Sequence, residues 1–126
     1  MNKIKTYTSE ECVIFSISED NALCVFEMTR VEEPQTYLMG EELKGSFLYF
    51  VNRIRVPDKL IGKGFGSALM KKAVEVSDKE NIQMFIHVSP YGTGLNKEEL
   101  LKFYKRYGFV ETPNLPGACM RVPNKQ

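Results

Sequence analysis

Three glycines alternate along a short segment of the chain, at Gly62, Gly64 and Gly66. The segment, residues 56–67, reads VPDKLIGKGFGS and lies between a predicted strand and a predicted helix. A glycine-rich turn at the start of a helix exposes several backbone amides that point the same way, and the helix dipole adds partial positive charge there. The segment therefore predicts a site for an anion, and a diphosphate is the group that suits it.

The spacing of these glycines excludes two phosphate-binding motifs. A Walker A loop needs Gly-x-x-x-x-Gly-Lys-Ser/Thr, and the sequence does not contain it. A dinucleotide fingerprint needs Gly-x-Gly-x-x-Gly, and residues 62–66 do not have that spacing. The alternative interpretation is structural, with the glycines letting the helix and the strand pack closely. Three alternating glycines after a buried strand favour the anion site.

The first half of the chain has the composition of β-structure. β-Branched and aromatic residues are frequent in residues 12–18 and 22–29, and turn-forming residues lie between them, which predicts a hairpin. Residues 31–45 contain a proline and two glycines and predict a loop. The strongest strand candidate is residues 47–56, FLYFVNRIRV, because both of its faces are largely apolar, as in a central strand covered on both sides.

The second half alternates strands with amphipathic helices. Apolar residues recur at helical spacing in residues 64–78 and 95–107, and shorter β-forming runs cover residues 84–89, 109–111 and 118–122. The order of elements predicts an α/β sandwich with a mixed sheet.

The second predicted helix has clear boundaries. Asn96 can accept a hydrogen bond from a free amide of the first turn, and Glu99 completes a capping box. Gly108 follows the helix as a C-terminal cap.

The length and composition predict a single domain, residues 1–126. No repeat and no Pro/Gly/Ser-rich linker divides the chain, and 126 residues are enough for one core. Hydrophobic residues make up 43% and charged residues 26%, which excludes a disordered or collagen-like chain.

The net charge and the numbers of cysteines and histidines limit which ligands and partners the chain is expected to bind. Seventeen Lys and Arg against sixteen Asp and Glu give a net charge of +1, without the basic excess that nucleic acid or acidic lipid requires. Three widely spaced cysteines and one histidine cannot form a zinc finger or ribbon, so no metal site is expected. The N-terminus has no apolar signal-peptide region, and the longest apolar run, residues 47–51, is too short to cross a bilayer. We expect a cytoplasmic protein that binds neither nucleic acid nor membrane.

Two motifs together resemble the GNAT superfamily of acyl-CoA-dependent N-acyltransferases. Residues 56–75, VPDKLIGKGFGSALMKKAVE, are similar to the cofactor segment with its motif Arg/Gln-x-x-Gly-x-Gly/Ala, in which Gly64 and Gly66 match the small positions. Residues 103–109, FYKRYGF, match the Phe-Tyr-x-x-x-Gly-Phe that commonly ends a later helix. The resemblance covers about residues 47–109. It implies a mixed, mostly antiparallel central sheet flanked by helices in a three-layer sandwich.

The chain departs from that family at two places. Ile61 occupies the Arg/Gln position, so a polar group is missing from the turn, where Lys63 would supply charge instead. The family usually has two helices after its first strand, and residues 1–46 are too short and too β-like for them. The resemblance therefore suggests a small member with a truncated N-terminal half and an open acceptor pocket, as a monomer or a homodimer.

The resemblance also implies roles for particular residues. Tyr104 matches the tyrosine that often protonates the departing CoA thiolate, although it also lies on an apolar helix face and could be a core aromatic. The residues expected to bind acetyl-CoA are Ile54, Arg55, Val56, Ile61, Gly62, Lys63, Gly64, Phe65, Gly66, Ser67, Asn96 and Phe103.

A general base is not evident in the sequence. The central strand contains no acid, and Asp58 just beyond it could simply be a solvated turn residue. We expect His87 to be a packed histidine rather than a base. Arg53 and Arg55 alternate on one face with Tyr49, where they could contact an acidic acceptor or form surface ion pairs.

Two functions follow from these observations. The first is an N-acetyltransferase that moves the acetyl group of acetyl-CoA to an amine, either a protein lysine or N-terminal amine or a small amine. The second is a degenerate domain of the same fold that binds CoA or a protein without catalysis. Tyr104 and the intact glycines favour the enzyme, whereas Ile61 and the missing base favour the binding module.

Overall fold

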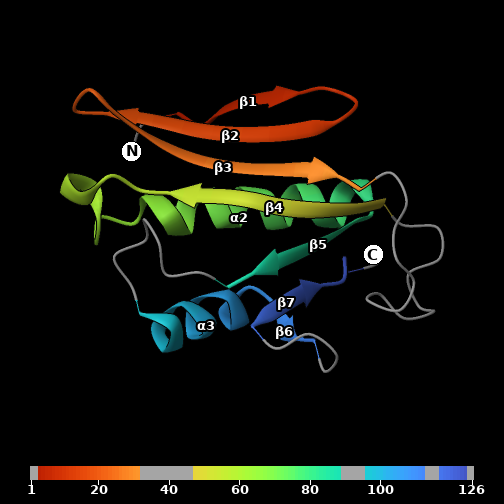
Figure 1. The fold of residues 1–126 in the computed structure, drawn as a ribbon. Helices are drawn as coiled ribbons and strands as arrows, with labels where there is room; N and C mark the ends of the chain where they lie inside the picture. The colour runs from red at the N-terminus through yellow and green to blue at the C-terminus, as the bar shows by residue number, and fades with distance from the viewer. Residues whose placement is uncertain (1–2, 32–46, 89–95, 113–116, 125–126) are drawn as a thin grey trace.

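The computed structural model describes residues 3–31, 47–88, 96–112 and 117–124. The elements in Figure 1 are β1 (Lys5–Thr8), β2 (Cys12–Glu19), β3 (Ala22–Arg30), β4 (Phe47–Arg55), the short 3-10 helix η2 (Asp58–Leu60), α2 (Phe65–Glu80), β5 (Ile82–His87), α3 (Lys97–Arg106), β6 (Val110–Glu111) and β7 (Ala118–Arg121).

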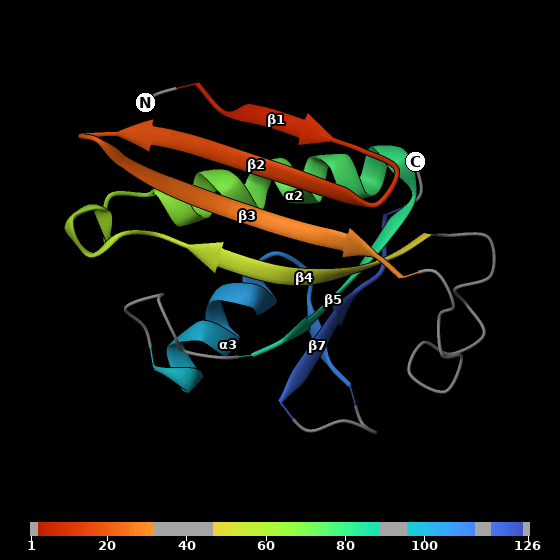
Figure 2. The ribbon, with the colours of Figure 1, turned by 45° about the horizontal axis from the view of Figure 1, so that its top comes forward.

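The strands form one seven-stranded sheet in the order β1-β2-β3-β4-β5-β7-β6 (Figure 2). Every neighbouring pair is antiparallel except β4 and β5, which run parallel with α2 as the crossover between them. This topology confirms the predicted mixed, mostly antiparallel sheet with flanking helices.

The predicted hairpin is β2–β3, and its turn is tight. Asp20 and Asn21 have φ angles of 49° and 59°, as the two central residues of a type I′ turn require. Strand β1, which pairs with β2 at the edge of the sheet, was not predicted. Its four residues are all exposed, so they give no alternation of buried and exposed positions for a sequence pattern to detect.

Strand β4 lies at the centre of the sheet and contains a bulge at Asn52. Arg53 pairs with Glu27 and Val51 with Met28, so Asn52 is the extra residue, and its side-chain oxygen accepts a hydrogen bond from the Thr29 hydroxyl. The bulge reverses the alternation along the strand.

The bulge corrects two predictions for β4. Tyr49 packs against the main core, whereas Arg53 and Arg55 are exposed on the other face, so the three do not share a face. Leu48 and Val51 are buried, but the second half of the strand is exposed on one side. Only its first half has the two covered faces that the sequence predicted.

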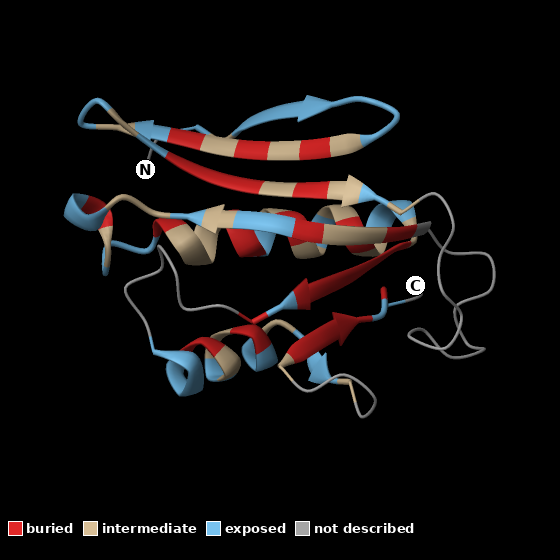
Figure 3. Ribbon diagram, in the orientation of Figure 1, coloured by how far each residue is buried: buried red, intermediate tan, exposed pale blue. Residues whose placement is uncertain are grey.

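Both described helices pack into one apolar cluster, so they cover the same face of the sheet. From α2 it contains Phe65, Leu69, Met70 and Ala73, and from α3 Leu100 and Tyr104. A smaller cluster on the opposite face contains Leu48, Phe85, Ala118 and Met120. The described residues thus account for the sheet and one helical layer of the predicted sandwich (Figure 3).

The helix boundaries have identifiable causes. Asn81 ends α2 in a left-handed conformation, and its amide donates to the carbonyl of Ser77. The predicted capping box of α3 is present: the Asn96 side chain accepts from the Glu99 amide at 2.8 Å, and the Glu99 carboxylate accepts from the Asn96 amide at 3.0 Å. Neither of the two helices in the described residues is long and apolar enough to cross a membrane.

Candidate functional site

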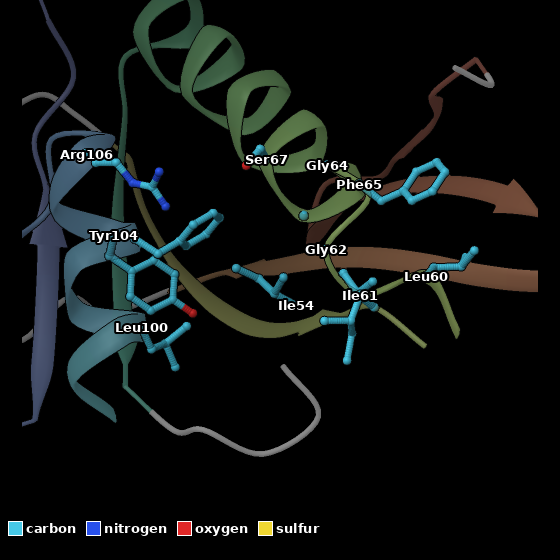
Figure 4. A pocket seen from close by; sticks show the side chains of 13 residues that line it. Ile54, Leu60, Ile61, Gly62, Gly64, Phe65, Ser67, Leu100, Tyr104 and Arg106 are labelled. Carbon is cyan, nitrogen blue, oxygen red and sulfur yellow. The ribbon is translucent and has the colours of Figure 1, made fainter. Parts of the chain in front are cut away.

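A cavity of about 350 Å³ lies where the end of β4 and the start of α2 face α3 (Figure 4). Its walls are mainly apolar. The lining residues are Ile54, Val56, Leu60, Ile61, Gly62, Gly64, Phe65, Gly66, Ser67, Leu100, Phe103, Tyr104 and Arg106. The structure therefore brings together the glycine turn and the end of α3, which are about forty residues apart in the sequence.

The glycine turn runs from η2 into α2 through two residues with positive φ. Leu60 closes the first part of the turn by donating its amide to the Pro57 carbonyl at 2.8 Å. Gly62 and Gly64 then have φ angles of 84° and 88°, a region that glycine adopts without steric cost. These two glycines are required by the backbone path itself.

The start of α2 leaves amides available to a ligand. The first intrahelical hydrogen bond runs from the Ala68 amide to the Gly64 carbonyl at 3.0 Å. The amides before Ala68 therefore have no acceptor within the helix, and in the described chain no side chain caps this end. With the helix dipole, they give this end of the cavity a partial positive charge.

The surroundings of Gly66 show whether glycine is needed there for close packing of helix and strand. A Cβ atom at Gly66 would lie 3.6 Å from Cγ2 of Val56, which is an ordinary van der Waals contact. Close packing of helix and strand therefore does not require glycine at this position, whereas an open approach to the cavity does favour it.

Strands β4 and β5 separate beside the cavity. Their pairing in the described chain extends from Phe47 and Ile82 to Phe50 and Phe85. Strand β4 continues to Arg55, and Ile54 lines the cavity beyond the last pair. Backbone groups on that edge of β4 are thus not used by β5 and can pair with an extended ligand.

Tyr104 belongs to both the core and the cavity. It is only 2% exposed, and its ring contacts those of Phe103 and Phe109 at centroid distances of 5.6 and 5.5 Å. Its hydroxyl nevertheless points into the cavity, toward Ile54 (Figure 4). Burial, with a smaller contribution from the neighbouring Cys119, raises the pKa of Tyr104 well above its usual value. The phenol is therefore neutral at neutral pH, and its hydroxyl can donate a hydrogen bond into the cavity.

Three lining residues were missed by the sequence: Leu60, Leu100 and Arg106. Leu60 and Leu100 are fully buried core residues, and their apolar character predicts burial but not a cavity. Arg106 follows Tyr104 by two positions in the recognised motif, and the helix dipole alone is enough to explain a cation near the end of a helix.

Three predicted cofactor residues do not line the cavity. Arg55 is exposed because it alternates with the inward-facing Ile54 and Val56. Lys63 is exposed in the turn, and Asn96 uses its side-chain oxygen to cap α3. Their contact with a cofactor stays a prediction.

The structure corrects the expectation for His87. This residue is exposed rather than packed: it lies on the same face of β5 as Phe85, whereas Ile86 and Val88 on the other face pack into the main cluster. Its Nε2 atom lies 3.7 Å from where a Cβ of Gly117 would be. Asp58 is exposed in η2, as a turn residue would be. The ion pairs found among the described residues involve neither Arg53 nor Arg55, so the predicted surface pairing does not explain them.

The described residues contain no group of three or more His, Cys, Asp or Glu side chains that could hold a metal ion. Cys12, Cys24 and Cys119 are free thiols.

The chain resembles solved structures but has no match among family models or curated proteins. Eleven solved chains match. A chain of a KacTA–DNA complex has 15% identity and a TM-score of 0.56, with 91% of this chain and 70% of that one covered. The anti-CRISPR protein AcrVA5 has 13% identity and a TM-score of 0.50, with 93% and 96% covered.

A third match is a GNAT-family acetyltransferase from Listeria monocytogenes, with 22% identity and a TM-score of 0.50. The alignment covers 87% of this chain and 62% of that one. At these identities the similarity is one of fold. The sheet order, the parallel β4–β5 pair and these neighbours together give the chain a GNAT-like fold.

Proposed function

We propose that this chain is an N-acetyltransferase that transfers the acetyl group of acetyl-CoA to an amine. The observation that carries the proposal is one cavity with free amides of a helix N-terminus at one side and a phenol hydroxyl at the other. The first suits a diphosphate and the second suits a departing thiolate. The GNAT-like fold supports acetyl transfer as the class of reaction.

The chain's own residues account for binding along the length of acetyl-CoA. The amides before Ala68 would hold the diphosphate, and the free edge of β4 near Ile54 would pair with the amide groups of the pantetheine arm. The apolar walls would exclude water around the thioester. Gly62 and Gly64 set the path of the turn, and Gly66 keeps the diphosphate position clear.

Acetyl transfer then requires two proton movements. A neutral amine attacks the thioester carbon and forms a tetrahedral oxyanion, and the amine loses a proton to water. The oxyanion collapses, the carbon–sulfur bond breaks, and Tyr104 donates its proton to the CoA sulfur. Burial raises the pKa of Tyr104, which makes the phenol a weaker acid, but the same apolar surroundings also disfavour a free thiolate. The proton would therefore pass to the sulfur as the carbon–sulfur bond breaks, and solvent would return a proton to Tyr104.

The proposal also covers the acceptor of the acetyl group, the cellular location and the kinds of partner. We propose a lysine or N-terminal amine of a protein, or a small amine, in the cytoplasm, without a metal, membrane or nucleic acid as partner. One structural neighbour is a complex with DNA. The net charge of this chain, +1, does not by itself favour binding to a polyanion.

A second candidate function is CoA or protein binding without catalysis. Ile61 favours it, because this apolar side chain lines the cavity at the place where the resembled family has Arg or Gln. In this case Tyr104 would be a core aromatic whose hydroxyl happens to face a cavity.

Thermal unfolding and product analysis test the proposal together. A ligand at one hundred times its Kd stabilises the fold by about 2.7 kcal/mol. We expect this shift with acetyl-CoA and CoA but not with ATP, and we expect acetylated product by mass spectrometry when amine peptides are added. A shift without product on any acceptor supports a CoA-binding module. The absence of a shift with saturating CoA compounds contradicts both the acetyltransferase and the CoA-binding module, and leaves protein binding without CoA.

A further inference from the structure

The cavity has one charged lining residue among those the structure describes, and it comes from α3. Arg106 lies in the last turn of α3, two residues after Tyr104. Figure 4 shows its guanidinium group directed into the cavity, from the side opposite Gly64 and Ser67 at the start of α2. The amides and the guanidinium group thus face one space from two different helices.

The Arg106 side chain is held in this direction by an aromatic ring. Its guanidinium carbon lies 5.5 Å from the centroid of the Phe103 ring, within the range of a cation–π interaction. Phe103 is itself fixed by edge contacts with the rings of Tyr104 and Tyr107, at 5.6 and 5.3 Å. Arg106 is an exposed residue, and among the described residues its guanidinium group contacts an aromatic ring rather than an acid.

Arg106 has no carboxylate partner among the described residues. The ion pairs found there join Lys105 to Glu111 and Arg121 to Asp78. Compensation of the helix dipole explains a cation near the end of α3, but it does not require the side chain to turn into the cavity. An oriented guanidinium group without an acid, facing free amides across a cavity, is an arrangement that binds a phosphate.

We propose that Arg106 binds the diphosphate of acetyl-CoA from the α3 side, opposite the amides at the start of α2. This inference rests on the proposed function and adds a binding residue to it. The guanidinium group supplies the cationic side chain that Ile61 does not provide in the turn. Because Tyr104 and Arg106 project from one helix, the same contact would place the thioester relative to the phenol.

Two substitutions separate charge from packing. Arg106→Gln keeps most of the aliphatic stem and removes the charge, whereas Arg106→Lys keeps the charge and loses the planar fork. Lys102→Gln is the matched control, because Lys102 is an exposed cation on the same helix that does not line the cavity. Titration calorimetry would use acetyl-CoA, acetyl-dephospho-CoA, which lacks the 3′-phosphate, and S-acetylpantetheine, which lacks all phosphates.

We expect Arg106→Gln to weaken acetyl-CoA and acetyl-dephospho-CoA equally, by about tenfold, and to leave S-acetylpantetheine unchanged. Arg106→Lys should recover part of the loss, Lys102→Gln should bind normally, and the salt dependence of acetyl-CoA binding should be smaller in Arg106→Gln. Equal affinity of wild type and Arg106→Gln overturns the inference while leaving the proposed function intact. A loss confined to acetyl-CoA assigns Arg106 to the 3′-phosphate and overturns the diphosphate contact. Failure of the wild type to bind acetyl-CoA contradicts the proposed function itself.

Discussion

Gly64 and Gly66 stand two residues apart but are glycine for different physical reasons. Gly64 has a φ of 88°, so any L side chain there would strain the backbone by roughly 1–3 kcal/mol. Gly66 lies within α2, and its missing Cβ would make only an ordinary contact with Val56. What a larger side chain at Gly66 would meet instead is the space that the cavity leaves for a ligand.

Gly66→Glu is therefore predicted to abolish acetyl-CoA binding while the fold survives. The side chain and its negative charge would occupy the place proposed for the diphosphate, and the first turn of a helix accepts Glu readily. Gly66→Ala is the matched control: it should fold at least as well as the wild type and retain most binding. Calorimetry with acetyl-CoA and circular dichroism on both variants make the comparison. Normal binding by Gly66→Glu would mean that the diphosphate lies elsewhere.

Tyr104 requires a variant that separates its ring from its hydroxyl. Tyr104→Phe keeps the ring contacts with Phe103 and Phe109 and deletes only the oxygen. If the hydroxyl protonates the thiolate, turnover should fall by about 10² to 10⁴ with little change in acetyl-CoA affinity. Steady-state rates measure the turnover, and calorimetry measures the affinity for acetyl-CoA.

Tyr107→Phe is the control for Tyr104→Phe. Tyr107 directly follows the same helix and packs its ring against Phe103, but it does not line the cavity, so its variant should turn over normally. A Tyr104→Phe rate within a few-fold of wild type would assign Tyr104 to the core alone.

At the scale of helices, strands and turns, the sequence predicted correctly the features that are set by neighbouring residues. The turn at Asp20 and Asn21, the capping box of α3 and the glycine turn each depend on a few adjacent residues, and all three are where the sequence placed them. The bulge at Asn52 depends instead on how β4 pairs with β3, which the sequence of β4 does not contain. For this reason the prediction that Arg53 and Arg55 share a face with Tyr49 was wrong.

In the candidate site, too, the predicted residues that line the cavity belong to local motifs, and the residues that were missed depend on contacts between elements. The sequence identified the residues of the turn and Tyr104 because both lie in recognisable motifs. It missed Arg106, because the direction of that side chain depends on the Phe103 ring and on the distance between two helices. The exposure of His87 was missed because it depends on what covers each face at the end of β5, which the sequence of that strand does not contain.

At the scale of the whole molecule, a single arginine joins the two helices that border the cavity. Arg121 on β7 is buried, and it donates to both carboxylate oxygens of Asp78 at 2.9 and 3.2 Å and to the Ser77 hydroxyl at 3.0 Å, all on α2. It also donates to the carbonyl of Tyr107, just beyond α3, at 2.7 Å. Arg121 therefore links α2 to the residue that follows α3, in addition to the apolar cluster that the two helices share.

The Asp78–Arg121 pair makes stability depend on pH. Partial burial acts to raise the pKa of Asp78, but the hydrogen bonds from Arg121 and the Asn124 amide, and the charge of Arg121, outweigh it and hold the pKa below its usual value. A carboxyl whose pKa is lower in the folded state stabilises the fold above its unfolded pKa. That stabilisation is lost as the pH falls from about 5 through the folded value.

Asp78→Asn should therefore cost about 2 kcal/mol of unfolding free energy near neutral pH, because it leaves the buried Arg121 without a counter-charge while its other acceptors remain. The difference from wild type should shrink on acidification, since protonation removes the same charge from Asp78 in the wild type. Glu111→Gln is the control, because its pair with Lys105 is about half exposed and should be worth less than about 1 kcal/mol. Urea unfolding of the three proteins across the acidic range measures these differences. A gap between wild type and Asp78→Asn that stays constant down to the most acidic pH would show that the pair contributes through shape rather than charge.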